Sequence, residues 1–146
     1  MKIALINPPS PFLENQKAIY NMGILRVATQ LKKEGHFVHL YDYTGKDISE
    51  IETISKFDIY GFSSTTPQFP IVYQLFKQLR DIYPTALTMI GGPHASAVAS
   101  LKKRNKDDIN IKRIEEFDII FEGEGESTKN MFKFGWAGTR GGREIK

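Results

Sequence analysis

The fold is decided by the stretch TALTMIGGPH at residues 85–94. Its first half is an apolar run typical of a buried strand, and its second half is a glycine turn that leads towards a helix. An apolar strand that ends in two glycines is typical of a strand that meets a ligand, because glycine tolerates positive φ and allows close approach to the backbone. This stretch therefore predicts a strand, a ligand-facing turn and a helix in direct succession.

Other apolar runs alternate with helical patterns on both sides of this stretch. The runs lie at residues 2–6, 36–41, 58–62 and 117–121, and helical spacing appears over residues 17–33, 47–55, 69–83, 95–103 and 127–132. Strands that alternate with helices imply right-handed crossovers and a parallel sheet that is covered on both faces. We therefore expect an α/β protein with a flavodoxin-like (Rossmann-like), doubly wound sheet of five parallel strands in the order 2-1-3-4-5.

Two segments show no strand or helix periodicity. Residues 104–113 are polar and rich in asparagine, which predicts a surface loop. Residues 133–146 are crowded with glycine and predict a disordered or artificially added tail. We therefore expect one folded domain over residues 1–132, followed by this tail.

Composition excludes several classes of function. The chain of 146 residues contains no cysteine, which rules out disulfides, thiolate metal sites and cysteine-ligated iron–sulfur clusters within it. There is no apolar run of membrane-spanning length and no basic stripe interleaved with aromatic residues. The phosphate-binding P-loop, the dinucleotide glycine fingerprint and the nucleophile elbow are also missing. We expect a cytoplasmic protein without nucleic-acid or membrane partners.

The candidate ligand-binding segments are those that leave the carboxyl ends of the predicted strands, where open parallel sheets bind their ligands. They are rich in small and hydroxylated residues, which favours a shallow, hydrogen-bonding floor for a large flat ligand over a deep catalytic cleft. The segments are Asn7-Pro8-Pro9-Ser10, Asp42-Tyr43, Ser63-Ser64-Thr65-Thr66, Gly91-Gly92-Pro93-His94 and Glu122-Gly123-Glu124-Gly125-Glu126.

Each segment also has a purely structural interpretation. The proline loop can be a stiff connection, and the hydroxyl run can cap the helix that follows it. A tight turn needs one glycine, so the pair Gly91 and Gly92 favours close approach by a ligand. His94 has no second metal ligand or nucleophile at useful spacing, which favours a local hydrogen bond. Glu124 and Glu126 suit a helix N-terminus better than acid–base chemistry. No catalytic or metal-ligating residue is therefore assigned.

Six segments of the chain form one ordered series. They are Asn7-Pro8-Pro9, Met22-Gly23-Ile24-Leu25, Glu34-Gly35-His36-Phe37-Val38, Ser63-Ser64-Thr65-Thr66, Gly91-Gly92-Pro93-His94-Ala95 and Gly123-Glu124-Gly125-Glu126. In this order they resemble the N-terminal cobalamin (vitamin B12)-binding domain of cobalamin-dependent radical S-adenosylmethionine enzymes, over about residues 1–132. Gly-Gly-Pro-His and Gly-Glu-Gly-Glu at this spacing are the most specific elements of the resemblance.

The resemblance implies a flavodoxin-like domain that holds cobalamin at the carboxyl edge of its sheet. The nucleotide tail of the cofactor would run past Ser63, Ser64, Thr65, Gly91 and Gly92, with Pro93 and His94 in the same turn. The loops that would border the corrin are Asn7-Pro8-Pro9 and Gly123-Glu124-Gly125.

Two departures qualify what the resemblance implies. The cobalamin domains of methionine synthase and the mutases carry D-x-H-x-x-G after the first strand, with the histidine as lower axial ligand, whereas this chain has NPPSPF at residues 7–12. Cobalamin would therefore lack a histidine ligand from this loop. The radical domain binds an iron–sulfur cluster through three cysteines, and this chain has none. The cluster and S-adenosylmethionine would belong to a second domain, missing from this chain, in the same protein or another.

The resemblance thus implies a cofactor-binding module of a methyltransferase-type enzyme that is not catalytic alone. Two other interpretations stay open. The chain could be a structural or interaction domain of the same fold without a cofactor, or a flavodoxin-like domain that binds another flat cofactor such as a flavin.

Overall fold

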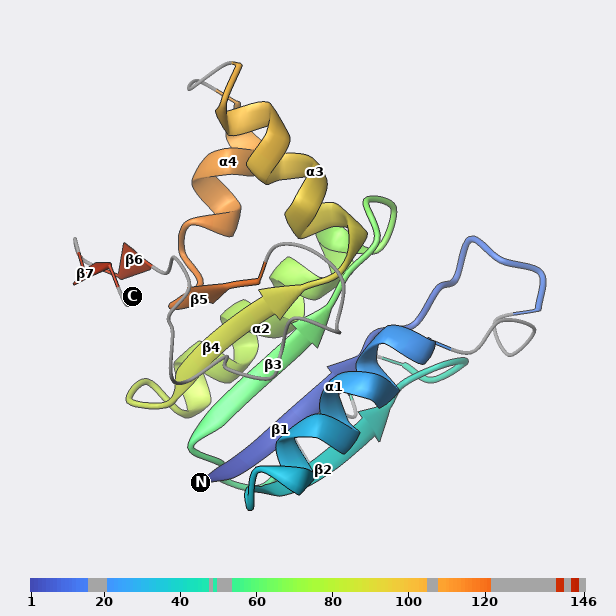
Figure 1. Ribbon diagram of the computed structural model, residues 1–146. Helices are drawn as coiled ribbons and strands as arrows, with labels where there is room; N and C mark the ends of the chain where they lie inside the picture. The colour runs from blue at the N-terminus through green and yellow to red at the C-terminus, as the bar shows by residue number, and fades with distance from the viewer. Residues whose placement is uncertain are drawn as a thin grey trace.

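One parallel sheet organises the chain. The computed structural model describes residues 1–15, 21–47, 49, 54–104 and 108–121, together with the backbone of 139–140 and 143–144. The strand order is β2-β1-β3-β4-β5, and every neighbouring pair is parallel. This arrangement confirms the predicted flavodoxin-like α/β fold (Figure 1). The strands are β1 (Lys2–Asn7), β2 (Phe37–Asp42), β3 (Ile59–Ser63), β4 (Leu87–Gly91) and β5 (Ile119–Ile120).

Helices cover the two faces of the sheet unequally. Helix α1 (Met22–Lys33) lies on the face turned towards the viewer in Figure 1, and α2 (Phe69–Ile82) lies behind the sheet. Helices α3 (Pro93–Lys102) and α4 (Ile109–Ile114) pack into the same cluster of buried side chains as α2. In the part of the chain that the structure describes, no helix is long and apolar enough to cross a membrane.

The pleat of the strands divides the core into two clusters. In β1, Ile3 and Leu5 pack with α1, whereas Ala4 and Ile6 pack on the opposite face with α2. The same alternation continues through β3, β4 and β5. Because both faces are buried, the strands are apolar at successive positions, which is why they read as continuous runs in the sequence.

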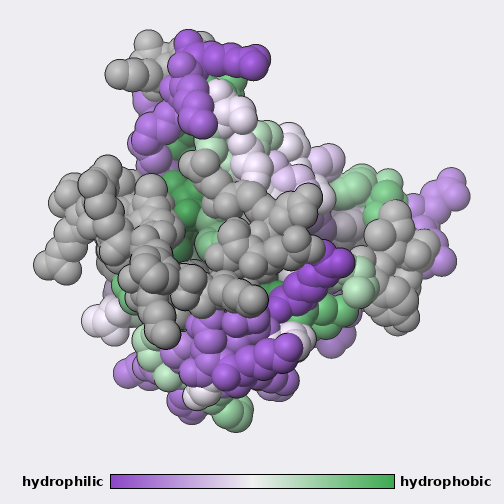
Figure 2. All heavy atoms as spheres, in the orientation of Figure 1, coloured by the Kyte–Doolittle hydropathy of each residue, from purple (hydrophilic) through white to green (hydrophobic). Residues whose placement is uncertain are grey.

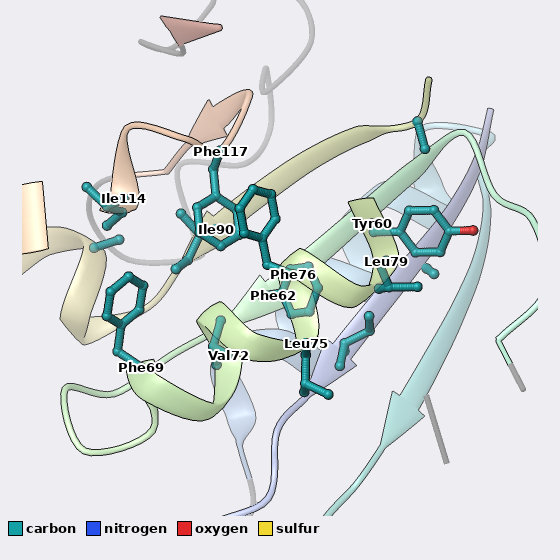
Figure 3. Close-up of a cluster of buried hydrophobic side chains, with 14 of the residues drawn as sticks. Tyr60, Phe62, Phe69, Val72, Leu75, Phe76, Leu79, Ile90, Ile114 and Phe117 are labelled. Carbon is teal, nitrogen blue, oxygen red and sulfur yellow. The ribbon is translucent and has the colours of Figure 1, made fainter. Parts of the chain in front are cut away.

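Aromatic side chains fill the α2 side. Phe76 and Phe117 are stacked with their ring centroids 4.1 Å apart, and Phe62 meets Phe117 edge-on at 5.9 Å (Figure 3). The hydroxyl of Tyr60 accepts a hydrogen bond from the Phe57 amide at 2.9 Å and donates one to the Ser55 carbonyl at 2.8 Å. Burial raises the pKa of Tyr60 to about 12, so the phenol stays protonated and keeps its donor.

A buried polar network fixes β5 against β4 and α2. The Asp118 carboxylate accepts hydrogen bonds from the Thr88 amide at 2.8 Å and the Thr88 hydroxyl at 3.0 Å. The Arg80 guanidinium lies 3.2 Å from the same carboxylate oxygen and donates to the Thr88 hydroxyl at 2.8 Å. The bonds to Asp118 in this network reach the Oδ2 atom of a carboxylate that is 1% exposed, and they anchor a strand of only two residues.

The structure corrects one predicted loop. Residues 104–113 were expected to form a polar surface loop, but α4 begins at Ile109 and continues to Ile114. The Asp108 side chain accepts a hydrogen bond from the Asn110 amide at 2.7 Å and so caps the helix. Ile111 and Ile114 are buried against the α2 side, and this apolar pair at a spacing of three residues was the overlooked signal of a helix.

Other predictions fall largely or wholly outside the described residues. The predicted helix over residues 127–132 lies outside them, as does most of the predicted helix over 47–55. Within the predicted tail over 133–146, the backbone of β6 (Thr139–Arg140) pairs antiparallel with β7 (Arg143–Glu144).

Candidate functional site

A cavity of about 500 Å³ lies on the α1 side of the sheet, at the carboxyl ends of β3 and β4. Its size falls within the range of roughly 300–1,000 Å³ that is usual for small-molecule sites. Helix α1, three strands, the turn after β4 and the first residue after β5 contribute to its lining. The described lining residues are Leu5, Asn21, Gly23, Ile24, Arg26, Val27, Gly61, Phe62, Ser63, Met89, Ile90, Gly91, Gly92, Pro93, Ser96 and Phe121.

The floor of the cavity is apolar and is centred on Gly61. Leu5, Gly61 and Met89 are register partners on three adjacent strands and face α1 together. A Cβ atom at Gly61 would lie 2.8 Å from Leu5 Cδ2 and 2.7 Å from Met89 Cε. The missing side chain therefore lets Leu5 and Met89 close over Gly61, and the three residues form an apolar surface against which a flat apolar group could lie.

The wall at the end of β4 is held by backbone contacts. Gly92 has a φ of 99°, and a Cβ atom there would lie 2.9 Å from the carbonyl oxygen of Ser64. The Ser64 amide donates to the Gly91 carbonyl and the His94 amide donates to the Ser64 carbonyl, both at 3.0 Å. Gly92 is thus required by the fold itself, in addition to any close approach by a ligand.

Of the hydroxylated residues at the end of β3, Ser63 faces the cavity, whereas Ser64 and Thr65 form hydrogen bonds within their own loop. Ser63 lines the cavity and accepts a hydrogen bond from the Asn21 amide group at 2.8 Å. Ser64 is fully buried and its hydroxyl donates to the Thr65 carbonyl, whereas the Thr65 amide and hydroxyl both donate to the Gln68 side chain. Gln68 itself precedes α2 without a side-chain cap, so none of these hydroxyls caps that helix.

Asn21 connects the start of α1 to the edge of the sheet. Its Oδ1 accepts a hydrogen bond from the Ile24 amide at 3.2 Å, and its Nδ2 donates to both Ser63 and the Asn7 side chain. Asn7 in turn donates to Asp42 at 3.1 Å. Partial burial raises the pKa of Asp42, but hydrogen bonds from Thr44 and Asn7 outweigh it and hold the pKa below its ordinary value. Asn7 therefore lies one hydrogen bond away from the cavity lining.

His94 lies in the first turn of α3, away from the cavity lining. Its ring is stacked on Phe69 with centroids 4.1 Å apart, and its Nδ1 is 3.1 Å from the Thr66 hydroxyl. The side chain is 2% exposed, and burial lowers the pKa of His94, so the imidazole is neutral near pH 7. The sequence favoured a locally bonded histidine, whereas the partner of His94 is Thr66, which lies 28 residues away in the sequence.

The structure gathers four of the predicted binding residues at the cavity, namely Ser63, Gly91, Gly92 and Pro93. Pro8 and Pro9 are buried but do not line the cavity. The Pro8 carbonyl accepts a hydrogen bond from the Gln68 side chain at 3.4 Å. The remaining predicted residues, Gly123, Glu124 and Gly125, lie outside the described residues.

Sequence reasoning missed the α1 contribution and the floor. One usable signal was present, because Gly61 interrupts an otherwise apolar strand, and a glycine inside a strand marks close approach to the backbone. Asn21 and Arg26 carry no comparable signal, since both belong to an amphipathic helix whose polar residues are expected to face water.

The lining combines an apolar floor with a polar rim. Asn21, Ser63 and Ser96 supply amide and hydroxyl groups, and Arg26 supplies a positive charge. Figure 2 shows this side of the molecule, with hydrophilic side chains gathered over α1. Among the residues that the structure describes, no group of three or more histidine, cysteine or acidic side chains could hold a metal ion. The arrangement is suited to binding a ligand that has both a flat apolar part and polar attachments.

Comparison with known protein families gives a match to most of the chain. Residues 16–130 match the B12 binding domain family, and this segment contains every cavity-lining residue except Leu5. A search of curated proteins found no match to the chain.

Proposed function

Because the chain belongs to the B12 binding domain family, we propose that it is a cobalamin-binding module whose cavity beside α1 receives the nucleotide tail of the cofactor. The observation that carries this proposal is the cavity of about 500 Å³ at the carboxyl ends of β3 and β4. Ligands of open parallel sheets bind at that edge, and the family match supports cobalamin as the ligand.

The residues present fit the tail of cobalamin. The tail ends in a flat aromatic base, and the floor formed by Leu5, Gly61 and Met89 offers an apolar surface without a side chain at its centre. Asn21 and Ser63 lie at one side of this floor and could hydrogen-bond the polar sugar. The corrin is too large to share the cavity with the tail, so we propose that it lies beyond the strand ends, near the Asn7-Pro8-Pro9 loop.

When bound, cobalamin supplies the cobalt chemistry of methyl transfer, and the chain supplies binding and orientation. The three histidines lie elsewhere than the cavity. His36 precedes the edge strand β2 and His39 lies within it, whereas His94 is buried beside Phe69. We therefore propose that cobalamin binds without a histidine ligand from the loop after β1.

The test is retention of hydroxocobalamin by the purified chain. We expect near-stoichiometric cobalt-corrin absorption to remain with the protein after removal of free ligand. Val27→Trp places a large side chain in the cavity lining, and Thr29→Trp places the same side chain on the exposed surface of the same helix. We expect the first variant to lose retention and the second to keep it.

Circular dichroism separates loss of binding from loss of fold in this experiment. If the folded wild-type chain retains no hydroxocobalamin, the proposed function is wrong for this chain, and a structural or interaction domain without cofactor becomes the better interpretation. If Val27→Trp binds as well as Thr29→Trp, the chain binds cobalamin but the tail does not enter this cavity.

We further propose that the partner is a radical S-adenosylmethionine domain, in the same or another chain, within a methyltransferase-type enzyme. The ordered series from Asn7-Pro8-Pro9 to Gly123-Glu124-Gly125 supports it, and the absence of cysteine means that another domain must hold the iron–sulfur cluster. The coding sequence downstream, or a neighbouring gene, should encode three cysteines in C-x-x-x-C-x-x-C. A different catalytic domain in that position would contradict this proposal.

A further inference from the structure

The orientation of the Asn21 side-chain amide is fixed by the groups around it. Its Oδ1 atom accepts a hydrogen bond from the Ile24 backbone amide at 3.2 Å, and a backbone N–H can only donate. The Nδ2 group therefore lies on the other side, where it donates to Ser63 Oγ at 2.8 Å and to Asn7 Oδ1 at 3.1 Å. Both hydrogens of the amide are thus in use, and the direction of both bonds is set.

The other end of the same network requires the same orientation. Asn7 Nδ2 donates to Asp42 Oδ1 at 3.1 Å and to the Thr44 hydroxyl at 3.2 Å. The Asp42 carboxylate is ionised at neutral pH, since its pKa lies below the ordinary value, and an ionised carboxylate can only accept. The Asn7 oxygen is therefore left to accept from Asn21. A group that can only donate at one end and a group that can only accept at the other determine every bond between them.

This direction determines what Ser63 offers to a ligand. Its oxygen accepts a hydrogen from Asn21, so its own hydrogen points elsewhere. Within the described part of the chain, the structure shows no acceptor for that hydrogen. Ser63 lines the cavity beside Gly92, where its Oγ would lie 3.4 Å from a Cβ atom. The hydroxyl is therefore a donor at the cavity wall, and a ligand atom that pairs with it there must be an acceptor.

The nucleotide tail of cobalamin has such acceptors in its phosphodiester, its sugar ring and its base. We infer that Asn21 is a positioning residue, which holds the Ser63 hydroxyl as a hydrogen-bond donor to an acceptor atom of the nucleotide tail, an inference that rests on the proposed function. In this role Asn21 acts on the ligand through Ser63. A side chain at position 21 that could only accept would reverse the bond and withdraw the donor from the ligand.

Asn21→Asp tests the direction of this bond. Aspartate caps a helix about as well as asparagine does, so the bond from the Ile24 amide and the start of α1 should be kept. The new carboxylate cannot donate, so it turns the Ser63 hydroxyl towards itself and away from the cavity. Gln30→Glu makes the same change from amide to carboxylate on α1, outside the cavity lining, and is the matched control.

Visible absorption measures the dissociation constants of three corrinoids. Cobalamin carries phosphate, sugar and base, cobinamide phosphate carries the phosphate alone, and cobinamide carries none of them. We expect Asn21→Asp and Ser63→Ala each to weaken cobalamin by about fivefold, which is the effect of one hydrogen bond. Cobinamide binding should change by less than about twofold, because this ligand has no tail, and Gln30→Glu should leave all three constants unchanged.

Cobinamide phosphate identifies the acceptor. A similar loss for this ligand assigns the bond to the phosphodiester, and a loss for cobalamin alone assigns it to the sugar or the base. Either result supports the inference. An equal loss for all three corrinoids would show that Asn21 acts on the site as a whole, and the inference would be wrong.

The double variant separates the direction of the bond from the added charge. A carboxylate at position 21 also repels the anionic phosphodiester, and that repulsion would persist without the Ser63 hydroxyl. We therefore expect Asn21→Asp to weaken cobalamin by less than about twofold in the Ser63→Ala background. The same fivefold loss in both backgrounds would assign the effect to charge and overturn the inference.

Two further outcomes distinguish this inference from the proposed function. If the wild type retains cobalamin and Ser63→Ala binds it as tightly, the inference is wrong and the proposed function stands. If the folded wild type, checked by circular dichroism, binds none of the three corrinoids, both are overturned.

Discussion

The two faces of the same sheet serve different purposes. On the α2 side, three helices close over the strands, and stacked rings such as Phe76 and Phe117 fill the space between them. On the α1 side, one described helix covers the sheet and a cavity remains beside it, floored by Leu5, Gly61 and Met89. One set of strands therefore provides a packed core on one face and a binding surface on the other.

The difference follows from which side chains the pleat directs to each face. In β3, Tyr60 and Phe62 face α2, whereas Ile59 and Gly61 face α1. At the floor, Gly61 has no side chain, and it lies between the flexible side chains of Leu5 and Met89 on the two neighbouring strands. The binding face thus depends on small residues, and we expect substitutions there to change ligand affinity more than stability, with the opposite pattern on the α2 side.

The largest expected effect is on the packed side. Phe117 is fully buried between Phe62 and Phe76, so Phe117→Ala should lower the free energy of unfolding by roughly 3–5 kcal/mol. Met89→Ala should cost about 2 kcal/mol, the lower end of the range for such truncations, because Met89 already borders open space. Urea denaturation at equilibrium measures both values.

Equal costs for the two variants would remove the proposed distinction between the faces. A matched check on the packed side is Ile82→Ala, which truncates an exposed residue of α2 and should change stability by less than about 0.5 kcal/mol.

Two glycines at the cavity give the second prediction. Gly92→Ala should destabilise the chain by roughly 1–3 kcal/mol, because φ is 99° and the new Cβ would meet the Ser64 backbone, which cannot move away cheaply. Gly61→Ala should cost about 1 kcal/mol, because its Cβ would meet side-chain atoms of Leu5 and Met89, which can shift more easily than backbone, and the change also removes backbone freedom from the unfolded chain.

Cobalamin retention should be sensitive to the substitution that has the smaller effect on stability, Gly61→Ala. Gly61→Ala raises the floor of the cavity and should weaken retention of hydroxocobalamin while the thermal unfolding midpoint stays close to the wild-type value. A Gly61→Ala variant with unchanged binding would show that the tail does not rest on this floor. A Gly92→Ala variant as stable as the wild type would contradict the structural requirement for glycine at that turn.

The contrast between these glycines also shows what the sequence could predict. Apolar runs such as ALTMIG reveal strands because both faces of a parallel sheet are buried, and their alternation with helices yields the strand order. The pair Gly91 and Gly92 marked the correct turn. The cause at Gly92 was hidden, because the clash with Ser64 arises only when β3 and β4 lie side by side.

The rest of the cavity depends on contacts between distant segments. Arg26 lines it only because α1 crosses the sheet at that place, and Asn21 reaches Ser63 over 42 residues of sequence. The polar network of Arg80, Thr88 and Asp118 was likewise invisible, since it joins α2 to β4 and to the residue that precedes β5. Spacing within one element cannot indicate such contacts.

The smallest expected effect concerns pH and the packed side. Burial lowers the pKa of His94 in the folded chain, so the unfolded chain binds a proton at a higher pH than the folded chain does. The free energy of unfolding should therefore fall as the pH decreases through the ordinary histidine pKa of about 6.5, with a slope of at most about 1.4 kcal/mol per pH unit. The slope from this group should fade as the pH rises well above that value.

Urea denaturation between pH 7.5 and 5.5 measures this slope at pH values where the carboxylates do not contribute to it. Asp42 and Glu116 have lowered pKa values, so the stability they provide is complete above their unfolded pKa values and is lost only at more acidic pH. We expect His94→Gln to flatten the slope, and His39→Gln, on the exposed edge strand, to leave it unchanged. If His94→Gln shows the same slope as the wild type, His94 does not cause it. The wild-type imidazole beside Phe69 would then be hydrated enough to take up a proton in the folded chain, and the packed side would be less closed than its aromatic stacking indicates.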